Sequence, residues 1–375
     1  MPMDPGQASL LTHTVADIYA DAEQQLIDLT ARYASQGVDG PQWSTHQRTQ
    51  IARFRAAVTQ LLHQLGNTSA NRIRSAVLEA ATIGDRAALA DLRRRLPDSA
   101  VRHSSTIDPA AIHALAVDTI RAITGTHPRI LRSAEDHYRH IITQVTGRTV
   151  TGIVTVRQAL QQALDRFASA GIEGFTDTAG RRWSMDTYAE VAIRTALVRA
   201  LNAGHAARLV AAGHDLVVVS AHPRPAPQCR PYEGQVLSLT GRTPNGPRTL
   251  PAGLGTGNAT VVVVASLAEA QARGLHHPNC RHRYTVWRPG LRLPDIPPDD
   301  PQGYRDEQRL RALERRARAA RRVQATAITP AAARAAHDRV AAVEAAITAH
   351  VATSGVQRQR WRERPRVAST FRRPA

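Results

Sequence analysis

The sequence predicts a chain that is mostly α with a small α+β domain. We expect an N-terminal helical bundle or arm, a central α+β domain, and C-terminal basic helices with a tail. Apolar residues make up 42% of the 375 residues but aromatic residues only 4%, which favours helical cores built from Ala, Leu, Val and Ile. Both ends carry apolar residues at three- and four-residue steps, whereas the middle has short apolar runs between turn residues.

Residues 1–105 are predicted to form the N-terminal arm. Residues 12–35 place Val15, Ile18 and Leu26 on one apolar face of a helix. Residues 46–66 repeat this pattern and stop at Gly66, and two more helices are expected over 69–84 and 85–96. Short Gly and Asn turns between them predict antiparallel helices.

A further helical segment is predicted over residues 106–171. Asp108 has the character of an N-cap, and Pro109 suits the first helical position. Helices are expected over 129–147 and 155–171, of which the second ends at Gly171.

Residues 172–290 are predicted to form the α+β domain with its Cys/His loops. A turn at residues 178–180 lies between β-like flanks, and Ser184 is expected to cap a helix that ends at Gly213. The apolar runs predict strands, and one short helix is expected between the last two. The strands fall within 215–221, 234–239, 260–266 and 281–287, and the helix within 267–274.

The C-terminal part begins with a Pro-rich linker over residues 291–301, because proline continues neither helix nor sheet. Residues 302–355 predict a basic helix and then an Ala-rich helix that starts at Thr329-Pro330 and ends at Gly355. Residues 356–375 form an Arg-rich tail, which we expect to be disordered when free.

Positive charge is concentrated at this end. The net charge is +18 and the chain has no lysine, so all 49 basic residues are arginine. Residues 302–375 hold 17 Arg against 6 Asp and Glu, a net of +11, which is typical of a polyanion-binding surface. Non-specific contact with double-stranded DNA is therefore expected, and a solvated tail is the alternative. The candidate residues are Arg358, Arg360, Arg362, Arg364, Arg366 and Trp361.

The chain has no apolar run of the roughly 18–20 residues that span a bilayer, so no membrane partner is expected. Its first residues lack the basic region and apolar core of a secretory signal, so we expect synthesis in a cytoplasm. Two cysteines in such a protein argue against a disulfide framework.

Both cysteines lie next to histidines, which suggests a structural zinc site. Cys229 follows His222 in one loop, and Cys280 follows His277 in another; His282 is a substitute ligand. Thiolate and imidazole pairs from two loops bind Zn²⁺ tetrahedrally. The alternatives are buried inert thiols and a Cys229–Cys280 disulfide.

A metal-dependent nuclease is the catalytic alternative. His276, His277 and Asn279 are the residue types with which ββα-metal nucleases activate water and hold an ion. That fold needs a helix after its hairpin, whereas residues 281–287 predict a strand. A nucleophilic pair of Cys229 with a histidine lacks a surrounding motif.

Three segments in order resemble the minor capsid proteins of tailed bacteriophages, especially those of actinobacterial phages, related to Mu-type head morphogenesis proteins. The segments are 171–200, 213–241 and 274–290. The matching residues are Phe175, Gly180, Arg181, Trp183, Arg194, Thr195, Ser220, His222, Cys229, Tyr232, Gly234, His277, Pro278, Asn279, Cys280, Arg281 and His282. Together they cover about 120 residues, with a fainter match in the helical N-terminal part.

The resemblance implies a virion component, assembled in the bacterial cytoplasm and located in the phage head at or near the portal. It implies portal and capsid proteins as partners, an oligomeric setting, and a part in head assembly and DNA packaging or ejection. It does not imply an enzyme. The helical arm suits docking to other subunits, and the arginines suit contact with packaged DNA.

Overall fold

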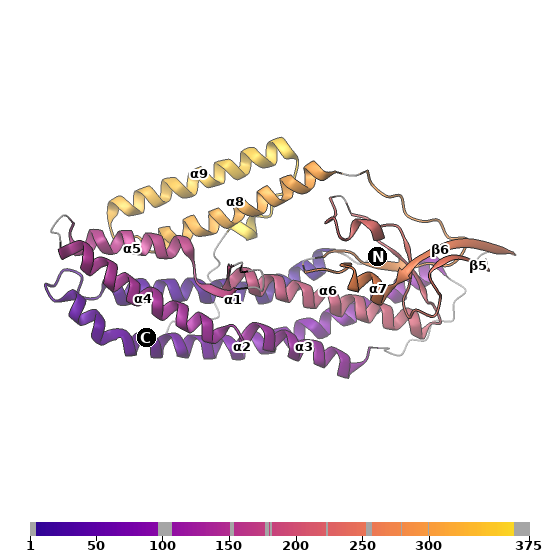
Figure 1. The fold of residues 1–375 in the computed structure, drawn as a ribbon, viewed down its shortest axis with the longest axis horizontal. Helices are drawn as coiled ribbons and strands as arrows, with labels where there is room; N and C mark the ends of the chain where they lie inside the picture. Colours follow the sequence, from indigo (N-terminus) through magenta and orange to yellow (C-terminus); the bar gives the residue numbers. More distant parts are fainter. Residues whose placement is uncertain are drawn as a thin grey trace. The chain divides into compact units, whose positions relative to one another are not determined.

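The computed structural model describes residues 5–96, 107–150, 154–176, 180, 182–222, 224–252, 257–278, 280–298 and 300–363, which are mainly helical (Figure 1). The α-helices are α1 (Pro5–Ser35), α2 (Trp43–Arg95), α3 (Pro109–Thr124), α4 (His127–Val150), α5 (Val156–Ala170), α6 (Met185–Ala211), α7 (Leu267–Ala272), α8 (Pro301–Ala325) and α9 (Pro330–Ser354). The strands are β1 (Glu173–Thr176), β2 (Arg182–Ser184), β3 (Leu216–Val219), β4 (Val236–Ser238), β5 (Gly246–Pro251), β6 (Asn258–Ser266) and β7 (Tyr284–Val286). The predicted fold class, mostly α with a small α+β part, is confirmed.

The chain forms two compact units, and each unit combines segments that are far apart in the sequence. Unit 1 consists of Met1–Val15, Asn71–Arg121 and Glu190–Tyr304. Unit 2 consists of Ala16–Ala70, Ala122–Ala189 and Arg305–Ala375. Five helices therefore contribute residues to both units: α1, α2, α3, α6 and α8.

Helix α2 corrects the prediction of three antiparallel helices between residues 46 and 96. The structure has one helix from Trp43 to Arg95, which continues through Gly66 and Gly84. Both glycines keep ordinary helical backbone and not the positive φ of a C-cap. A helix-interior glycine costs only about 1 kcal/mol relative to alanine, which the surrounding helix-forming residues offset.

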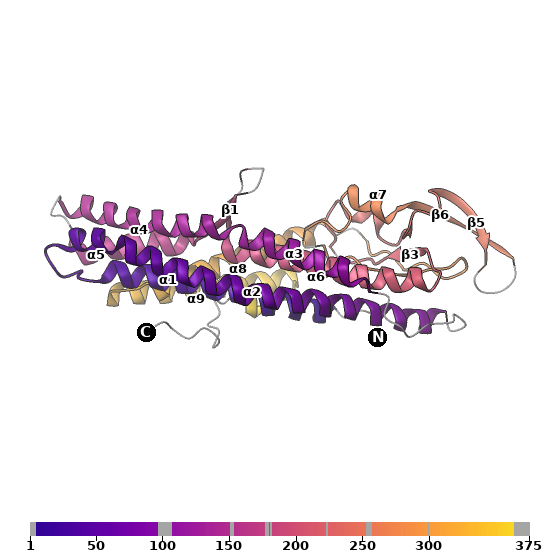
Figure 2. The same cartoon turned by 90° about the horizontal axis from the view of Figure 1, so that it is seen from below.

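Unit 2 is built on helices with a small aromatic centre. Helices α4 and α5 pack side by side (Figure 2). The rings of Phe54 and Tyr138 stack 4.4 Å apart, and the ring of Tyr33 meets Phe54 edge-on. The Tyr138 hydroxyl donates a 2.6 Å hydrogen bond to Oε1 of Gln47, so burial of the ring leaves its polar end satisfied.

Helices α8 and α9 form a hairpin within unit 2 (Figure 1). Their shared core contains Leu310, Leu313 and Ile347, and Val356 beyond α9 joins it. Thr329 caps α9 as predicted, since its side chain accepts the backbone N–H of Ala332.

Two other predicted helix ends, at Asp108 and Gly171, agree with the structure. The Asp108 carboxylate accepts the backbone N–H of Ala110 at the start of α3. Helix α5 ends at Gly171, whose φ of 73° lies in the region that favours glycine. Strands β1 and β2 pair antiparallel, which confirms the predicted β-like flanks; residues 178 and 179 of the predicted turn lie outside the described residues. Ser184 does not cap α6 as predicted, because its hydroxyl donates to the Asp186 carboxylate and this carboxylate accepts the backbone N–H of Thr187.

Unit 1 contains a five-stranded sheet in the order β5-β6-β4-β3-β7. Strands β4 and β6 pair parallel and the remaining neighbours antiparallel. All four residues of β3 are buried, because Val217 and Val219 face one apolar cluster while Leu216 and Val218 face another. Strand β5 was not predicted, because its prolines at both ends and its polar residues obscure the strand pattern.

Within unit 1, α2 and α6 approach so closely that two glycines are required. A Cβ on Gly84 would lie 1.9 Å from the carbonyl oxygen of Leu201, and a Cβ on Gly204 would lie 2.1 Å from that of Ala81. Glycine is needed here for close packing of two helix backbones, and not for a turn.

Among the described residues, no helix has both the length and the apolar character needed to cross a membrane.

Candidate metal centre and buried arginine network

Two loops of unit 1 bring both cysteines and one histidine together. Cys229 lies between β3 and β4, while Cys280 and His282 lie between α7 and β7. The sulfurs are 3.6 Å apart, and the sulfur of Cys280 is 3.3 Å from Nδ1 of His282. The three ligand atoms all lie within 4.8 Å of one another. These side chains therefore form one cluster, which we call the Cys/His cluster.

The Cys/His cluster is closed to solvent. Relative exposure is 0% for Cys229, 4% for Cys280 and 3% for His282. The two thiols interact directly: the hydrogen bond from Cys229 lowers the pKa of Cys280, and the same bond together with burial raises the pKa of Cys229. The cysteines are free thiols, and the pair favours one thiolate.

Backbone amides act on both sulfurs, although for Cys229 their effect is smaller than that of Cys280 and burial. The N–H of His282 donates to the sulfur of Cys280 at 3.3 Å. The backbone amides of His276 and His277 act on the sulfur of Cys229 and favour its thiolate form. His276 has φ of 59°, a conformation rare for a residue with a side chain, and it lies in this amide-presenting turn.

Glu233 fixes the orientation of His282. Its Oε1 lies 2.8 Å from Nε2 of His282 and also accepts the backbone N–H of His222 at 2.7 Å. Burial lowers the pKa of His282, but Cys280 and Glu233 outweigh it and raise that pKa overall. Glu233 was not among the predicted site residues, because neither its spacing nor its sequence neighbours indicate a role beside His282.

The predicted ligand set is only partly brought together. His222 lies beside the cluster, and its ring centroid is 4.7 Å from that of His282. Its Nε2 is 3.1 Å from both the Ser220 hydroxyl and the carbonyl oxygen of Arg281. His277 lies outside the cluster, half-buried, with Nδ1 2.7 Å from the carbonyl oxygen of Pro278. Asn279, named in the nuclease alternative, lies outside the described residues.

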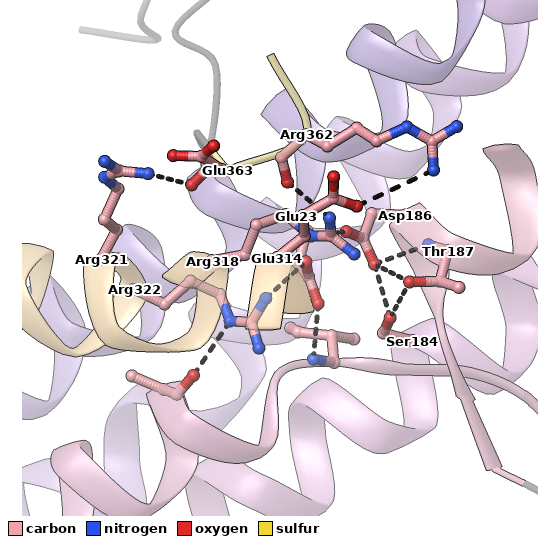
Figure 3. A network of polar contacts seen from close by, with 12 residues as sticks. Glu23, Ser184, Asp186, Thr187, Glu314, Arg318, Arg321, Arg322, Arg362 and Glu363 are labelled. Atoms are coloured by element: carbon pink, nitrogen blue, oxygen red, sulfur yellow. Dashed lines mark hydrogen bonds and ion pairs between the residues drawn. The ribbon is translucent and has the colours of Figure 1, made fainter. Parts of the chain in front are cut away.

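A buried network of arginines and carboxylates lies in unit 2 (Figure 3). Arg322 on α8 faces Glu23 on α1 at 3.4 Å and also donates to the carbonyl oxygen of Ala168 at 3.0 Å. Arg318 pairs with Asp186 at 3.2 Å. The carboxylates of Glu23 and Asp186 are 3% and 8% exposed, so unpaired charge there would be costly.

Two acids of this network, Glu23 and Asp186, differ in the direction of their pKa shifts. Burial raises the pKa of Glu23 to about 7, and the nearby Asp186 adds to this rise. For Asp186, burial acts in the same direction, but Arg318, Arg322 and hydrogen bonds from Ser184 and Thr187 together lower its pKa.

Part of the predicted tail is ordered by this network. Arg358 makes two hydrogen bonds to Glu363, at 2.6 and 2.7 Å, and Arg321 donates to the backbone carbonyl of Glu363. Arg362 is 8% exposed and faces Glu314 at 4.0 Å. The expectation of a tail disordered from residue 356 is therefore wrong for residues 356–363, because buried ion pairs and the apolar contact of Val356 hold them.

The predicted nucleic-acid-binding residues thus have different surroundings. Arg358 and Arg362 face carboxylates, and the guanidinium of Arg362 lies 4.6 Å from the ring centroid of Trp361. Arg360 is exposed. Arg364 and Arg366 lie outside the described residues.

Comparison with known proteins agrees with the resemblance in the sequence. The profile of the family described as phage minor capsid protein 2 matches residues 3–352. A structural protein of Lactococcus phage LL-H is 26% identical over 102 residues, which cover 27% of this chain and 28% of that protein. No solved structure matches. Because the family match extends over most of the chain, the protein belongs to the phage minor capsid protein 2 family, and this membership supports a structural role in the phage capsid.

Proposed function

We propose that this protein acts at or near the portal vertex of a phage head, in head assembly and in DNA packaging or ejection. The observation that carries the proposal is the family match over residues 3–352, which includes segments of both units. The relative from Lactococcus phage LL-H, named a structural protein, supports it over a short stretch. The protein is assembled in the bacterial cytoplasm and contacts portal and capsid proteins in an oligomeric virion.

The proposal assigns no enzymatic step to the chain. A metal-dependent nuclease has to present its activated water to a phosphodiester, so its metal needs an open coordination position that the substrate can reach. The Cys/His cluster is instead sealed, with exposures of 4% or less for its three side chains. This closure supports a fastening role over catalysis.

Contact with DNA is proposed for the outward face of α8 and for exposed arginines of the tail. Arg309 and Arg316 are seven residues apart and so share one helix face. They are exposed, as are Arg315 and Arg360. Burial is the main cause of the lowered pKa of Arg315, and the positive charge of Arg318 adds to it. A phosphate backbone neutralises exposed arginines without reading sequence.

The portal role is tested by co-expression with the portal protein of the same phage, followed by size-exclusion chromatography. We expect the two proteins to co-elute in a complex larger than the portal ring alone. The portal protein expressed alone is the control. Separate elution, with both proteins folded, would contradict the portal assignment.

DNA contact is tested by measuring affinity for random-sequence duplexes over a range of salt concentrations. The test variant carries Arg309→Gln, Arg315→Gln and Arg316→Gln. The control carries equal charge removal at exposed positions of α2: Arg53→Gln, Arg72→Gln and Arg86→Gln.

Each lost phosphate contact lowers the slope of log affinity against log salt concentration by about 0.9. This slope should therefore fall in magnitude by about 2 to 3 in the α8 variant. The α2 variant should keep most of the slope. Equal slopes in the two variants would show that the α8 face is not the contact.

A further inference from the structure

We propose that one Zn²⁺ ion fastens unit 1 and is bound by Cys229, Cys280, His282 and His222. Three of these side chains already form the Cys/His cluster, with sulfurs 3.6 Å apart and 3.3 Å between the sulfur of Cys280 and Nδ1 of His282. Ligand atoms around one tetrahedral Zn²⁺ are separated by about 3.3–3.8 Å, given its bond lengths to sulfur and nitrogen. Two of the separations in the cluster are therefore already close to the required spacing, and all three ligand atoms lie within 4.8 Å of one another.

The sulfurs have the donors that zinc-bound thiolates need. The amide of His282 donates to the sulfur of Cys280, and amides of the turn at His276 and His277 serve the sulfur of Cys229. A thiolate accepts such bonds better than a thiol does, since it carries the full negative charge. Two inert buried thiols would not require a turn that directs amides at sulfur.

Both histidines can present Nδ1 to the metal. Nε2 of His282 faces the carboxylate of Glu233, which only accepts, so Nε2 carries a proton; Nδ1 faces the sulfur of Cys280 at 3.3 Å and is the nitrogen that would bind the metal in place of its proton. Nε2 of His222 likewise faces the carbonyl oxygen of Arg281, so its Nδ1 is free to bind. His222 lies just outside the cluster, and its ring has to move toward the sulfurs on binding.

The topology explains what the ion would fasten. Cys229 and His222 belong to the loop after β3, whereas Cys280 and His282 belong to the loop before β7. Strands β3 and β7 are antiparallel neighbours of only four and three residues. An ion joining their two loops would add binding free energy to this short pairing.

His277 provides the sharpest comparison, because it lies in the same loop as His282 but outside the cluster. Its Nδ1 contacts the carbonyl oxygen of Pro278, and it is more exposed than His282. His282 therefore takes the place of His277 in the predicted ligand set. Zinc binding here does not depend on the proposed role in the capsid.

The test uses the full chain purified without chelator. We expect one zinc per chain by elemental analysis, and a sulfur-to-cobalt charge-transfer band with tetrahedral d–d bands after replacement of zinc by Co²⁺. Both thiols should resist a thiol reagent until a chelator is added. Absence of stoichiometric metal and of the cobalt bands, or thiols that react equally with and without chelator, would overturn the proposal.

Variants test the ligand set. His282→Ala and His222→Ala should weaken Zn²⁺ binding in competition with a chromogenic chelator, and Glu233→Gln should weaken it by about 10- to 100-fold. His277→Ala should bind as the parent does. A loss for His277→Ala that equals the loss for His282→Ala would overturn the ligand assignment. Circular dichroism of each variant establishes that it is folded, and the cobalt spectrum of the parent chain keeps the test decisive if a variant does not fold.

Discussion

Arg208 and Asp85 form a two-point ion pair between α6 and α2 within unit 1. Nε of Arg208 lies 2.9 Å from Oδ1 of Asp85, and Nη2 lies 2.8 Å from Oδ2. Their side chains are 4% and 11% exposed. The pair lies one residue from Gly84 and four from Gly204, where the two helix backbones come closest, so charge pairing and close packing specify the same contact.

Removing one partner of this pair should be strongly destabilising. Arg208→Met leaves the Asp85 carboxylate buried without its counter-charge, and we expect a loss of about 3–5 kcal/mol in the free energy of unfolding. The double variant Arg208→Met/Asp85→Leu should recover much of this loss, because no buried charge remains. Urea unfolding measures both, and equal losses in the single and double variants would contradict the explanation.

The two glycines of the α2–α6 contact should not tolerate alanine. Gly84→Ala and Gly204→Ala each place a Cβ about 2 Å from a carbonyl oxygen, so the helices must separate. We expect each substitution to lower the free energy of unfolding by about 1–3 kcal/mol or more, as in an overpacked core. Gly147→Ala is the matched control, because no atom lies within 4 Å of its Cβ position on α4.

Gly147→Ala should stabilise by about 0.5–1 kcal/mol through helix propensity. Thermal melting of the three variants compares them directly. Similar melting shifts for Gly84→Ala and Gly147→Ala would refute the close contact.

The buried carboxyl of Glu23 should give stability an unusual pH dependence. Its folded pKa of about 7 exceeds the ordinary 4.5, so the folded state binds this proton more tightly. The contribution of Glu23 to the free energy of unfolding is full below pH 4.5 and is lost as the pH rises through 7. Its size is on the order of 3 kcal/mol. Glu23→Gln should remove this decline, as measured by urea unfolding between pH 5 and 8.

Asp186 should affect the pH dependence of stability in the direction opposite to Glu23, which the variant Asp186→Asn tests. The folded pKa of Asp186 is lowered, so its contribution is present above the ordinary pKa and lost as pH falls through the lowered one. The variant should lose stability at neutral pH, and its difference from the parent should shrink in acid.

For the Glu23 prediction, a decline in stability from pH 5 to 8 that persists in Glu23→Gln would show that another group causes the decline.

The ordering of residues 356–363 should depend on Glu363. This side chain is 2% exposed and accepts both hydrogen bonds from Arg358. Charged hydrogen bonds contribute about 1.5–3 kcal/mol, so Glu363→Ala should speed tryptic cleavage after Arg358 and Arg362 by about tenfold or more. Asp338→Ala removes the same charge from an exposed position of α9 and should leave the rate unchanged. Mass spectrometry of the early fragments measures both rates.

Local signals predicted most of the helices and strands. Three predicted helix ends depend only on contacts between residues close in the chain, and the structure confirms each of them: Asp108-Pro109, Thr329-Pro330 and Gly171. The four buried residues of β3 were visible as an apolar run. Such features depend on residues that are neighbours in the chain, so a local sequence pattern predicts them.

Features that depend on distant segments were not predictable. Gly84 was expected to end a helix, but it lies in α2 because Leu201 of α6 packs against it. His277 and His282 both lie close to Cys280 in the sequence, and only the folded chain shows that His282 is the one in contact with its sulfur. Arg362 resembled a DNA-binding residue, because Glu314 lies 48 positions earlier and meets it only in the folded chain.

Quantitative mass spectrometry of purified phage particles tests whether the chain is a component of the phage head. We expect the chain in washed virions, in few copies relative to the major capsid protein, and we expect it to remain in heads after tails are removed. A chain that is abundant in the infected cell but absent from purified heads would contradict a role in the capsid.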